Sequence, residues 1–302
     1  MTVSKLMTMH DAIAANVHDG DTVSLEGFTH LIGFAAGHEI IRQRRRDLTL
    51  CRLTPDVIYD QMIAAGCARK LVFSWAGNPG AGSLHAFRRA IEKGDPPLEI
   101  EEYSHFGMVA RLSAGSARLP FWPLRNYQGT DLPVANPRIR TVTCPFTGEV
   151  LAAVPALNPD VTIVHVQRAD AEGNAQVWGL LGTQKEAAFA AARVVVVAEE
   201  LVDQSVIRAD PNRTVIPGMI VNAVVIEPWG AHPSYAQGYY DRDNDFYVAW
   251  EDISRDAARL QAYLDQWVYG VRDRAEYLER QPALRNRLQA SLQLSGEVNY
   301  GY

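Results

Sequence analysis

The sequence has few of the features that mark secreted, zinc-binding or membrane proteins. Its three cysteines, Cys51, Cys67 and Cys144, lie far apart and form no CxxC pair, so we expect neither a disulfide framework nor a zinc knuckle. No run of about 18 apolar residues, the length that a transmembrane helix needs, occurs in the sequence. We therefore expect a soluble, cytoplasmic protein with reduced cysteines and no membrane partner.

The sequence also lacks a positive net charge and a recognisable metal-binding spacing. It has 29 Lys and Arg residues against 35 Asp and Glu residues, which gives a formal net charge of -6. Nucleic acids usually bind to a basic face, so a nucleic acid is not expected as a partner. The histidines are scattered without HxH or HxxxH spacing, so we expect no metal site and no permanently bound cofactor.

What the chain does have is an alternation of helical and strand patterns. Its 302 residues, 47% of them hydrophobic, are enough for one large core, and we predict a single domain over 1–302 with a helical C-terminal extension at 246–302. The unbroken apolar run at 194–198 suits a parallel strand that is covered on both faces. The patterns predict an α/β fold with a layered, largely parallel sheet and helices on both faces.

The predicted elements follow from apolar periodicity and from turn residues. An irregular segment is expected at 119–124. Helices are expected at 5–17, 34–46, 56–65, 84–93, 106–117 and 184–193, and strands at 21–26, 48–53, 70–75, 98–103, 150–154, 160–167, 194–198 and 221–226.

Two glycine-containing turns follow predicted strands. The strand at 21–26 ends at Gly27, and glycine accepts backbone conformations that other residues avoid. The strand at 70–75 is followed by a glycine-rich loop at 76–83 and then by a helix, an order that presents backbone N–H groups to an anion. Because open α/β sheets bind ligands at the carboxyl ends of their strands, both turns are candidates for ligand contact.

Several motifs resemble those of the first, or α, chain of the two-subunit, family I CoA-transferases. The resemblance runs across nearly the whole chain and is closest to the 3-oxoadipate and glutaconate types. The motifs are Glu26-Gly27-Phe28-Thr29-His30, Phe73-Ser74-Trp75-Ala76-Gly77-Asn78-Pro79-Gly80, Cys144-Pro145-Phe146-Thr147-Gly148-Glu149, His165-Val166-Gln167-Arg168-Ala169-Asp170, Trp178-Gly179, Ile216-Pro217-Gly218-Met219 and Pro228-Trp229-Gly230-Ala231-His232-Pro233-Ser234.

The resemblance implies a reaction and a partner. In this family a glutamate attacks the acyl-CoA thioester and becomes a glutamyl-CoA thioester in a ping-pong reaction. That glutamate lies in a Ser-Glu-Asn-Gly motif of the second, or β, chain, and this sequence contains no such motif. The chain is therefore expected to hold no catalytic nucleophile and to act with a CoA-transferase β chain, in a heterodimer or a heterotetramer.

The substrates follow from the same resemblance. We expect CoA transfer from succinyl-CoA to a dicarboxylic acid, with 3-oxoadipate favoured, in the degradation of aromatic compounds. The coenzyme A thioester is then a substrate and not a permanently bound cofactor.

The resemblance also implies that this chain lines the acid-binding side of the cleft. His30 and His105 would contact a distal carboxylate, and the glycine turns would offer N–H donors to developing negative charge. Each residue has a structural alternative, such as a turn for the glycines, an N-cap for Ser83 and packing for the histidines. The predicted substrate-binding residues are Gly27, Phe28, Thr29, His30, Ser74, Gly77, Asn78, Gly80, Gly82, Ser83 and His105.

One departure from the family pattern concerns Glu26. The broad signature has two glycines before the phenylalanine, and here Glu26 replaces the first of them. Its carboxyl group would contact substrate or join a structural ion pair, for which Arg52 on the next predicted strand is a candidate. His165, in the predicted strand at 160–167, is expected to be a core histidine. Glu199 follows the strand at 194–198, where a base could sit, and a structural role is expected for it.

Three other functions stay open at this stage. One is CoA transfer to glutaconate or another dicarboxylate, and a second is a non-catalytic scaffold whose partner holds all the chemistry. A third is CoA-thioester hydrolysis, because a steroid ring-opening branch resembles this family and carries an acidic residue in the segment corresponding to 102–105. Here His105 takes that place, which disfavours hydrolysis, although Glu101 and Glu102 lie close by.

Overall fold

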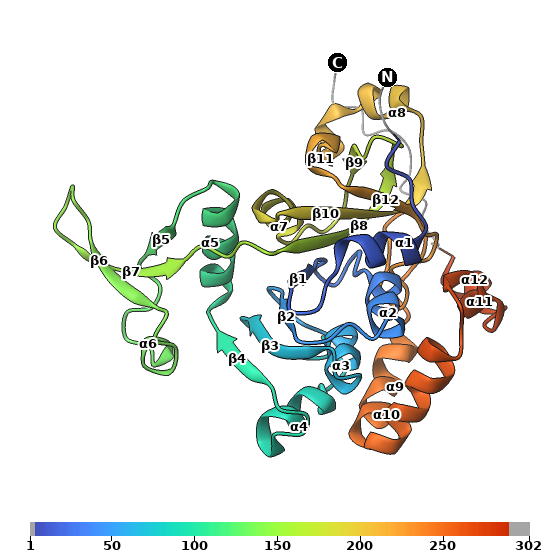
Figure 1. Cartoon of the computed structure of the whole chain (residues 1–302), viewed down its shortest axis with the longest axis horizontal. Helices are drawn as coiled ribbons and strands as arrows, with labels where there is room; N and C mark the ends of the chain where they lie inside the picture. Colours follow the sequence, from blue (N-terminus) through green and yellow to red (C-terminus); the bar gives the residue numbers. More distant parts are fainter. Residues whose placement is uncertain (1–3, 290–302) are drawn as a thin grey trace.

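The structure, a computed structural model, describes residues 4–289 around one mostly parallel sheet (Figure 1). Parallel strands lie in the order β12-β10-β8-β1-β2-β3-β4, and the short antiparallel strands β9 and β11 extend the end of β8. The strands are β1 (Thr22–Leu25), β2 (Leu48–Cys51), β3 (Ala68–Phe73), β4 (Glu99–Glu102), β8 (Val161–Ala169), β9 (Ala175–Gln176), β10 (Arg193–Leu201), β11 (Thr214–Ile216) and β12 (Ala223–Ile226).

Helices cover both faces of this sheet. In β10, Val195 and Val197 pack in the apolar cluster that contains α1 to α4, whereas Val194 and Val196 pack in another cluster with α7, because successive side chains of a strand point to opposite faces. The helix α5 packs on the same side as α7. The predicted layered α/β fold is confirmed. These helices are α1 (Met9–Asn16), α2 (Phe34–Arg42), α3 (Val57–Ala64), α4 (His85–Lys93), α5 (His105–Ser116) and α7 (Gln184–Ala190), and a further short helix, α8 (Gln204–Ala209), follows β10.

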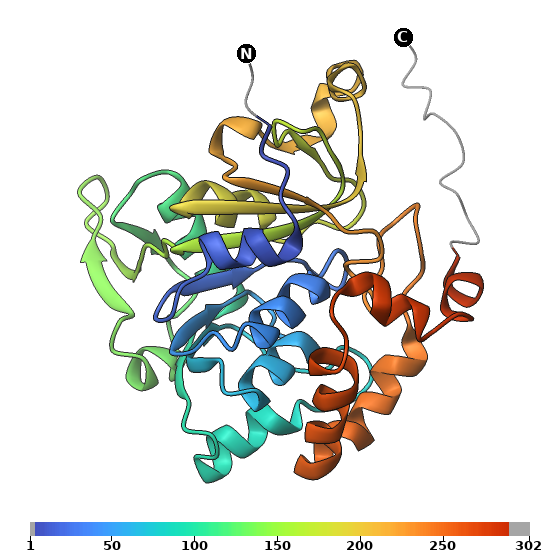
Figure 2. The same cartoon turned by 45° about the vertical axis from the view of Figure 1, so that its right-hand side comes forward.

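The C-terminal helices pack against the first of these layers. Trp250 and Leu260 are buried in the same cluster as α2 and α3, and Figures 1 and 2 show α9 and α10 beside α3 and α4. Residues 290–302 of the predicted helical extension lie outside the described residues. The helices in this cluster are α9 (Asn244–Arg255) and α10 (Ala257–Leu264), whereas α11 (Arg274–Glu279) and α12 (Leu284–Leu288) form a separate apolar cluster with Trp229 and Trp267.

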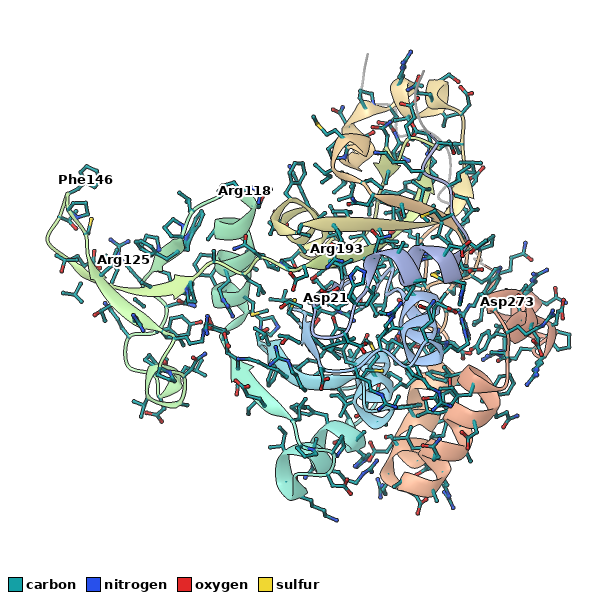
Figure 3. The ribbon with its side chains drawn as sticks, viewed as in Figure 1. Asp21, Arg118, Arg125, Phe146, Arg193 and Asp273 are labelled. Carbon is teal, nitrogen blue, oxygen red and sulfur yellow. The ribbon has the colours of Figure 1, made fainter. Side chains whose placement is uncertain are left out.

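A small antiparallel sheet projects from the main body at the left of Figure 1. It has the order β5-β7-β6, with β5 (Phe121–Leu124), β6 (Arg140–Thr143) and β7 (Val150–Pro155), and the short helix α6 (Leu132–Ala135) lies between β5 and β6 in the chain. The prediction of irregular structure at 119–124 was wrong from Phe121 onward, because pairing with β7 makes this segment an edge strand. Figure 3 shows Phe146, which is 93% exposed, at the far end of this sheet.

Over residues 4–289, none of the helices combines the length and the apolar character that a membrane crossing requires.

Candidate functional site

The chain segments that follow β1, β2 and β3 lie at the carboxyl edge of the sheet, and those after β2 and β3 are in contact. After β3, Ser74 donates hydrogen bonds from its backbone N–H (3.2 Å) and from its Oγ (2.5 Å) to the carbonyl oxygen of Leu53, which follows β2. The Gly77 N–H donates to the carbonyl oxygen of Pro55 at 3.2 Å. Because parallel strands end at one edge, the two predicted loops are brought to the place where α/β sheets bind ligands.

The first loop turns at Gly27 and is fixed by His30. Gly27 has a φ of 140°, and a Cβ there would lie 2.7–2.9 Å from backbone atoms of residues 30–32, so only glycine fits. His30 is fully buried, with Nδ1 donating to the Leu180 carbonyl oxygen (3.0 Å) and Nε2 accepting from the Gln237 N–H (3.0 Å). Burial lowers the pKa of His30 to about 4. The ring is therefore neutral near pH 7 with both nitrogens engaged, which fits the packing alternative.

Phe28 and Thr29 are the more accessible part of the first loop. Both are half-buried, whereas the residues on either side of them are buried. Thr29 has a φ of 56°, a left-handed conformation that is uncommon for a β-branched residue. Phe28 and Thr29 are the two predicted residues of the first loop that are not fully buried.

Glu26 is buried directly before this loop, and its carboxyl group is fully engaged. It is 1% exposed and accepts hydrogen bonds from Ser24 Oγ (2.6 Å) and Thr183 Oγ1 (3.1 Å). Burial raises its pKa, an effect that Ser24 and the charge of Arg52 only partly oppose. The expected ion pair between Arg52 and Glu26 does not form. Arg52 pairs instead with Asp56, whose Oδ1 lies 3.1 Å from Arg52 Nη1.

In the second loop, at 76–83, most backbone N–H groups already donate hydrogen bonds to acceptors within the chain. Asn78 is buried, while Gly80 is exposed at the tip of the turn. The alternative of Ser83 as an N-cap is wrong, since Leu84 occupies that position of α4 without a side-chain capping bond. Several backbone N–H groups of this loop already donate hydrogen bonds within the chain, so they are engaged before any anion binds. They belong to Gly77, Asn78, Ala81, Gly82 and Ser83.

His105 has a different environment from His30. It is the first residue of α5 and is exposed, and the preceding Ser104 caps the helix by accepting from the Gly107 N–H at 3.0 Å. Nearby, the Glu101 carboxylate is buried against Arg111 Nη1 at 2.8 Å. His105 is thus the predicted histidine that the structure leaves open to a ligand at this edge.

His165 and Glu199 have the structural roles that the sequence predicts. His165 Nε2 lies 2.7 Å from Glu199 Oε1, and both residues are buried. The other Glu199 oxygen accepts from the Trp229 N–H at 2.6 Å, and Tyr240 Oη also bonds to this carboxylate. The pair joins β8 and β10 to the segment after β12.

Several residues that shape this edge carry no signal in the sequence. Asp56 pairs with Arg52, Thr183 binds Glu26, and Glu251 binds the second loop. Thr183 and Glu251 come from segments remote in sequence, so no local spacing marks them.

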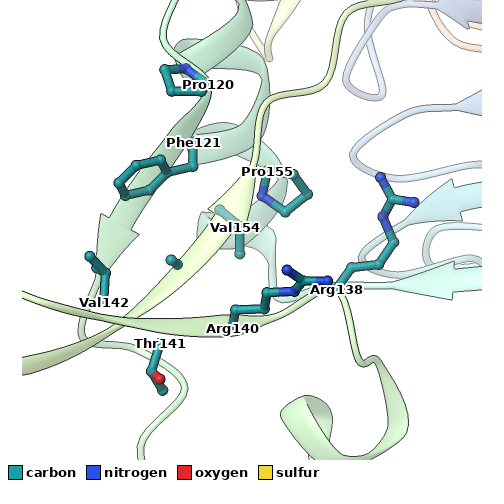
Figure 4. Close-up of a pocket in the computed structure, with 9 residues that line it drawn as sticks. Pro120, Phe121, Arg138, Arg140, Thr141, Val142, Val154 and Pro155 are labelled. Atoms are coloured by element: carbon teal, nitrogen blue, oxygen red, sulfur yellow. The ribbon is translucent and has the colours of Figure 1, made fainter.

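A pocket of about 460 Å³ lies elsewhere, on the small antiparallel sheet (Figure 4). None of its lining residues is a predicted site residue, and one of them, Arg138, lies 3.4 Å from the Glu101 carboxylate at the end of β4. In the part of the chain that the structure describes, no group of three or more His, Cys, Asp or Glu side chains is placed to hold a metal ion. The pocket is lined by Pro120, Phe121, Arg138, Arg140, Thr141, Val142, Ala153, Val154 and Pro155.

Known proteins resemble this chain in both fold and sequence. One chain of the 3-oxoadipate CoA-transferase of Pseudomonas knackmussii is 54% identical over 276 residues, which are 91% of this chain and 97% of that protein. The crystal structure of glutaconate CoA-transferase from Acidaminococcus fermentans has a TM-score of 0.90, with 33% identity and 98% of both chains covered. One chain of the cholesterol ring-cleaving hydrolase of Rhodococcus jostii is 27% identical, over 89% of this chain and 93% of its own length.

The family of coenzyme A transferases matches residues 6–227, which include the central sheet and both edge loops. With the extensive identity to one chain of a CoA-transferase, this match shows that the chain belongs to the coenzyme A transferase family.

Proposed function

We propose that this chain is the α chain of a two-subunit CoA-transferase that moves CoA from succinyl-CoA to 3-oxoadipate, in the degradation of aromatic compounds. The observation that carries the proposal is the 54% identity, over 91% of the chain, to the corresponding chain of a 3-oxoadipate CoA-transferase. The partner is a β chain that supplies the nucleophilic glutamate. The CoA thioester binds as a substrate.

The geometry of the carboxyl edge supports a substrate-binding role without a nucleophile. An attacking carboxylate must be ionised and within reach of the thioester. Glu26 is 1% exposed, and both of its oxygens accept hydrogen bonds from the chain's own hydroxyl groups. A partner chain that contributes the attacking group would meet the half-buried Phe28 and Thr29 at this edge.

His105 is the residue that we assign to the distal carboxylate of the acid. It is exposed at the first position of the twelve-residue helix α5, where the helix dipole favours a negative charge. His30 is neutral and engaged, so it acts by holding the first loop in place.

The test is a CoA-transfer assay on this chain co-expressed with its candidate β chain. Succinyl-CoA is offered with 3-oxoadipate, glutaconate or acetate, and both the acyl-CoA product and free CoA are followed. We expect acyl-CoA without free CoA, with 3-oxoadipate as the best acceptor. Native mass spectrometry of the same sample gives the number of chains in the complex.

The same assay separates the alternatives. Preference for glutaconate would replace the acceptor, as the similarity to glutaconate CoA-transferase makes reasonable. Stoichiometric free CoA without any acceptor would instead support a hydrolase. His105→Ala should raise KM for the acid, with Lys93→Ala, exposed at the end of α4, as the control. Unchanged acid kinetics in the His105 variant would favour a scaffold role for this chain.

A further inference from the structure

The C-terminal helix α9 reaches back to the glycine loop that follows β3. The carbonyl oxygen of Tyr247 accepts a hydrogen bond from Asn78 Nδ2 at 2.6 Å, and the Glu251 carboxylate accepts one from the Ser83 N–H at 2.8 Å. The two contacts hold the loop near its beginning and at its end. Both helix residues lie beyond residue 227, where the family match ends.

A third contact and a glycine complete this junction. Arg242 Nη2 donates to the carbonyl oxygen of Pro79 at 3.0 Å, and its guanidinium lies 3.9 Å from the centre of the Tyr247 ring. Gly82 has a φ of 150°, and a Cβ there would collide with the Glu251 carboxylate. Glycine at this position is therefore what allows Glu251 to approach the loop.

The Glu251 carboxylate is held in a fixed orientation and remains charged. Its other oxygen contacts His85 Nε2 at 3.0 Å and Arg255 Nη2 at 2.5 Å. The hydrogen bond from the Ser83 N–H, followed by that from His85, lowers the pKa of Glu251 to about 2. A charged acceptor makes a stronger hydrogen bond than a neutral one, so this contact is the strongest restraint on the end of the loop.

The loop in turn is joined to the rest of the carboxyl edge. The Gly77 N–H donates to Pro55, and the Asn78 and Gly82 backbones exchange hydrogen bonds across the turn. These bonds connect the end of the loop, beside Ser83, through the turn to the segment after β2.

We propose that Glu251 is a positioning residue of the acid-binding site, which acts by fixing the conformation of the loop at 76–83. Its substitution changes the affinity for the acid without removing any group that touches the substrate. The inference rests on the proposed function and adds to it that the loop at 76–83, which holds five of the predicted substrate-binding residues, contacts the acid substrate of CoA transfer.

The experiment compares four variants of the chain in complex with its β chain. Glu251→Ala removes the acceptor, whereas Glu251→Gln keeps an oxygen that can still accept from the Ser83 N–H. Gly82→Ala displaces Glu251 from the other side of the contact. Asp252→Asn is the matched control, an exposed carboxylate on the same helix. Hydrogen exchange of the amides at 77–83 is measured beside kcat and KM for the acid.

We expect faster exchange of the 77–83 amides in Glu251→Ala and Gly82→Ala, together with a loss of about tenfold or more in kcat/KM for the acid. Glu251→Gln keeps a neutral acceptor for the Ser83 N–H but loses the charge, so it should restore part of both, and the control should change neither. Exchange that stays at the wild-type rate in Glu251→Ala would overturn the restraint itself. Faster exchange with wild-type acid kinetics would overturn the positioning role.

The two proposals fail in different ways. If the wild-type complex transfers no CoA, the proposed function is refuted and the effect on acid binding is refuted with it. The exchange rates would still decide whether Glu251 holds the loop.

Discussion

Replacement of Glu26 tests the description of the first loop most directly. Glu26→Ala leaves the hydroxyl groups of Ser24 and Thr183 without the acceptor that each now uses at 2.6 Å and 3.1 Å. An unpaired buried polar group costs about 1–3 kcal/mol, so for the two hydroxyl groups we expect a loss of roughly 2–6 kcal/mol in the free energy of unfolding. Glu26→Gln should cost far less, because its amide can accept from one hydroxyl and donate to the other.

The pH dependence of the Gln variant isolates the charge of Glu26. Burial raises the pKa of Glu26 above its usual 4.5, so the folded state binds this proton more tightly than the unfolded chain does. The stability that the carboxyl group contributes is full below about pH 4.5 and falls by about 1.4 kcal/mol per pH unit as the pH rises toward the folded pKa. Glutamine does not titrate, so the free energy of unfolding of Glu26→Gln should increase relative to that of the wild type as the pH rises.

Urea unfolding of the wild type and the two variants, from about pH 5 to about pH 7, measures both effects. The reasoning fails if Glu26→Ala is as stable as Glu26→Gln, because the two hydroxyl groups would then not depend on the carboxyl group. It also fails if the difference between wild type and Glu26→Gln does not change with pH, because burial would then not perturb the proton.

Two further predictions concern groups whose surroundings are equally well defined. Gly27→Ala should yield insoluble protein or lose several kcal/mol, because a Cβ would meet backbone atoms and not movable side chains; a soluble variant with an unchanged melting temperature would contradict this. His232 is buried and its pKa is lowered to about 4, so stability should fall as the pH drops from about 6.5 toward about 4. His232→Gln should reduce that fall by up to roughly 3 kcal/mol, and an identical pH profile of unfolding would count against the assignment.

The main sheet could be predicted because its strands carry a strong apolar signal. The run at 194–198 lies inside β10, and the burial of both faces of that strand is what such a run indicates. The small antiparallel sheet has a comparable signal only in β7, where the sequence predicts a strand at 150–154. Its strand β5 contains Pro123, and its strand β6 holds only one apolar residue, Val142. Strands of this kind are stabilised by their neighbours in the fold rather than by a pattern of their own.

The position of the candidate site was predictable, but the state of its donors was not. Neighbouring parallel strands end at a common edge, so the loops after β1 and β3 had to lie at the same edge of the sheet. That the Ser83 N–H is already bound by Glu251, or that Arg52 pairs with Asp56 in place of Glu26, depends on packing between distant segments. A glycine-rich loop in the sequence shows where donors are and not whether they are free.

The C-terminal helices decide whether the segment that matches the family can fold by itself. Trp250 is fully buried and donates from Nε1 to Asp60 Oδ2 at 3.1 Å, and Leu260 and Leu264 lie in the same apolar cluster as the sheet. Burial of such side chains stabilises by about 1.5–3 kcal/mol each, so losing them approaches the whole stability of a typical domain, about 5–15 kcal/mol. We therefore expect a fragment that ends before Asn244 to aggregate or to unfold without cooperativity, as followed by circular dichroism and urea. A soluble fragment with a cooperative transition would instead make the C-terminal segment an accessory to an independent domain, and the restraint on the glycine loop would be a later addition to a site that forms without it.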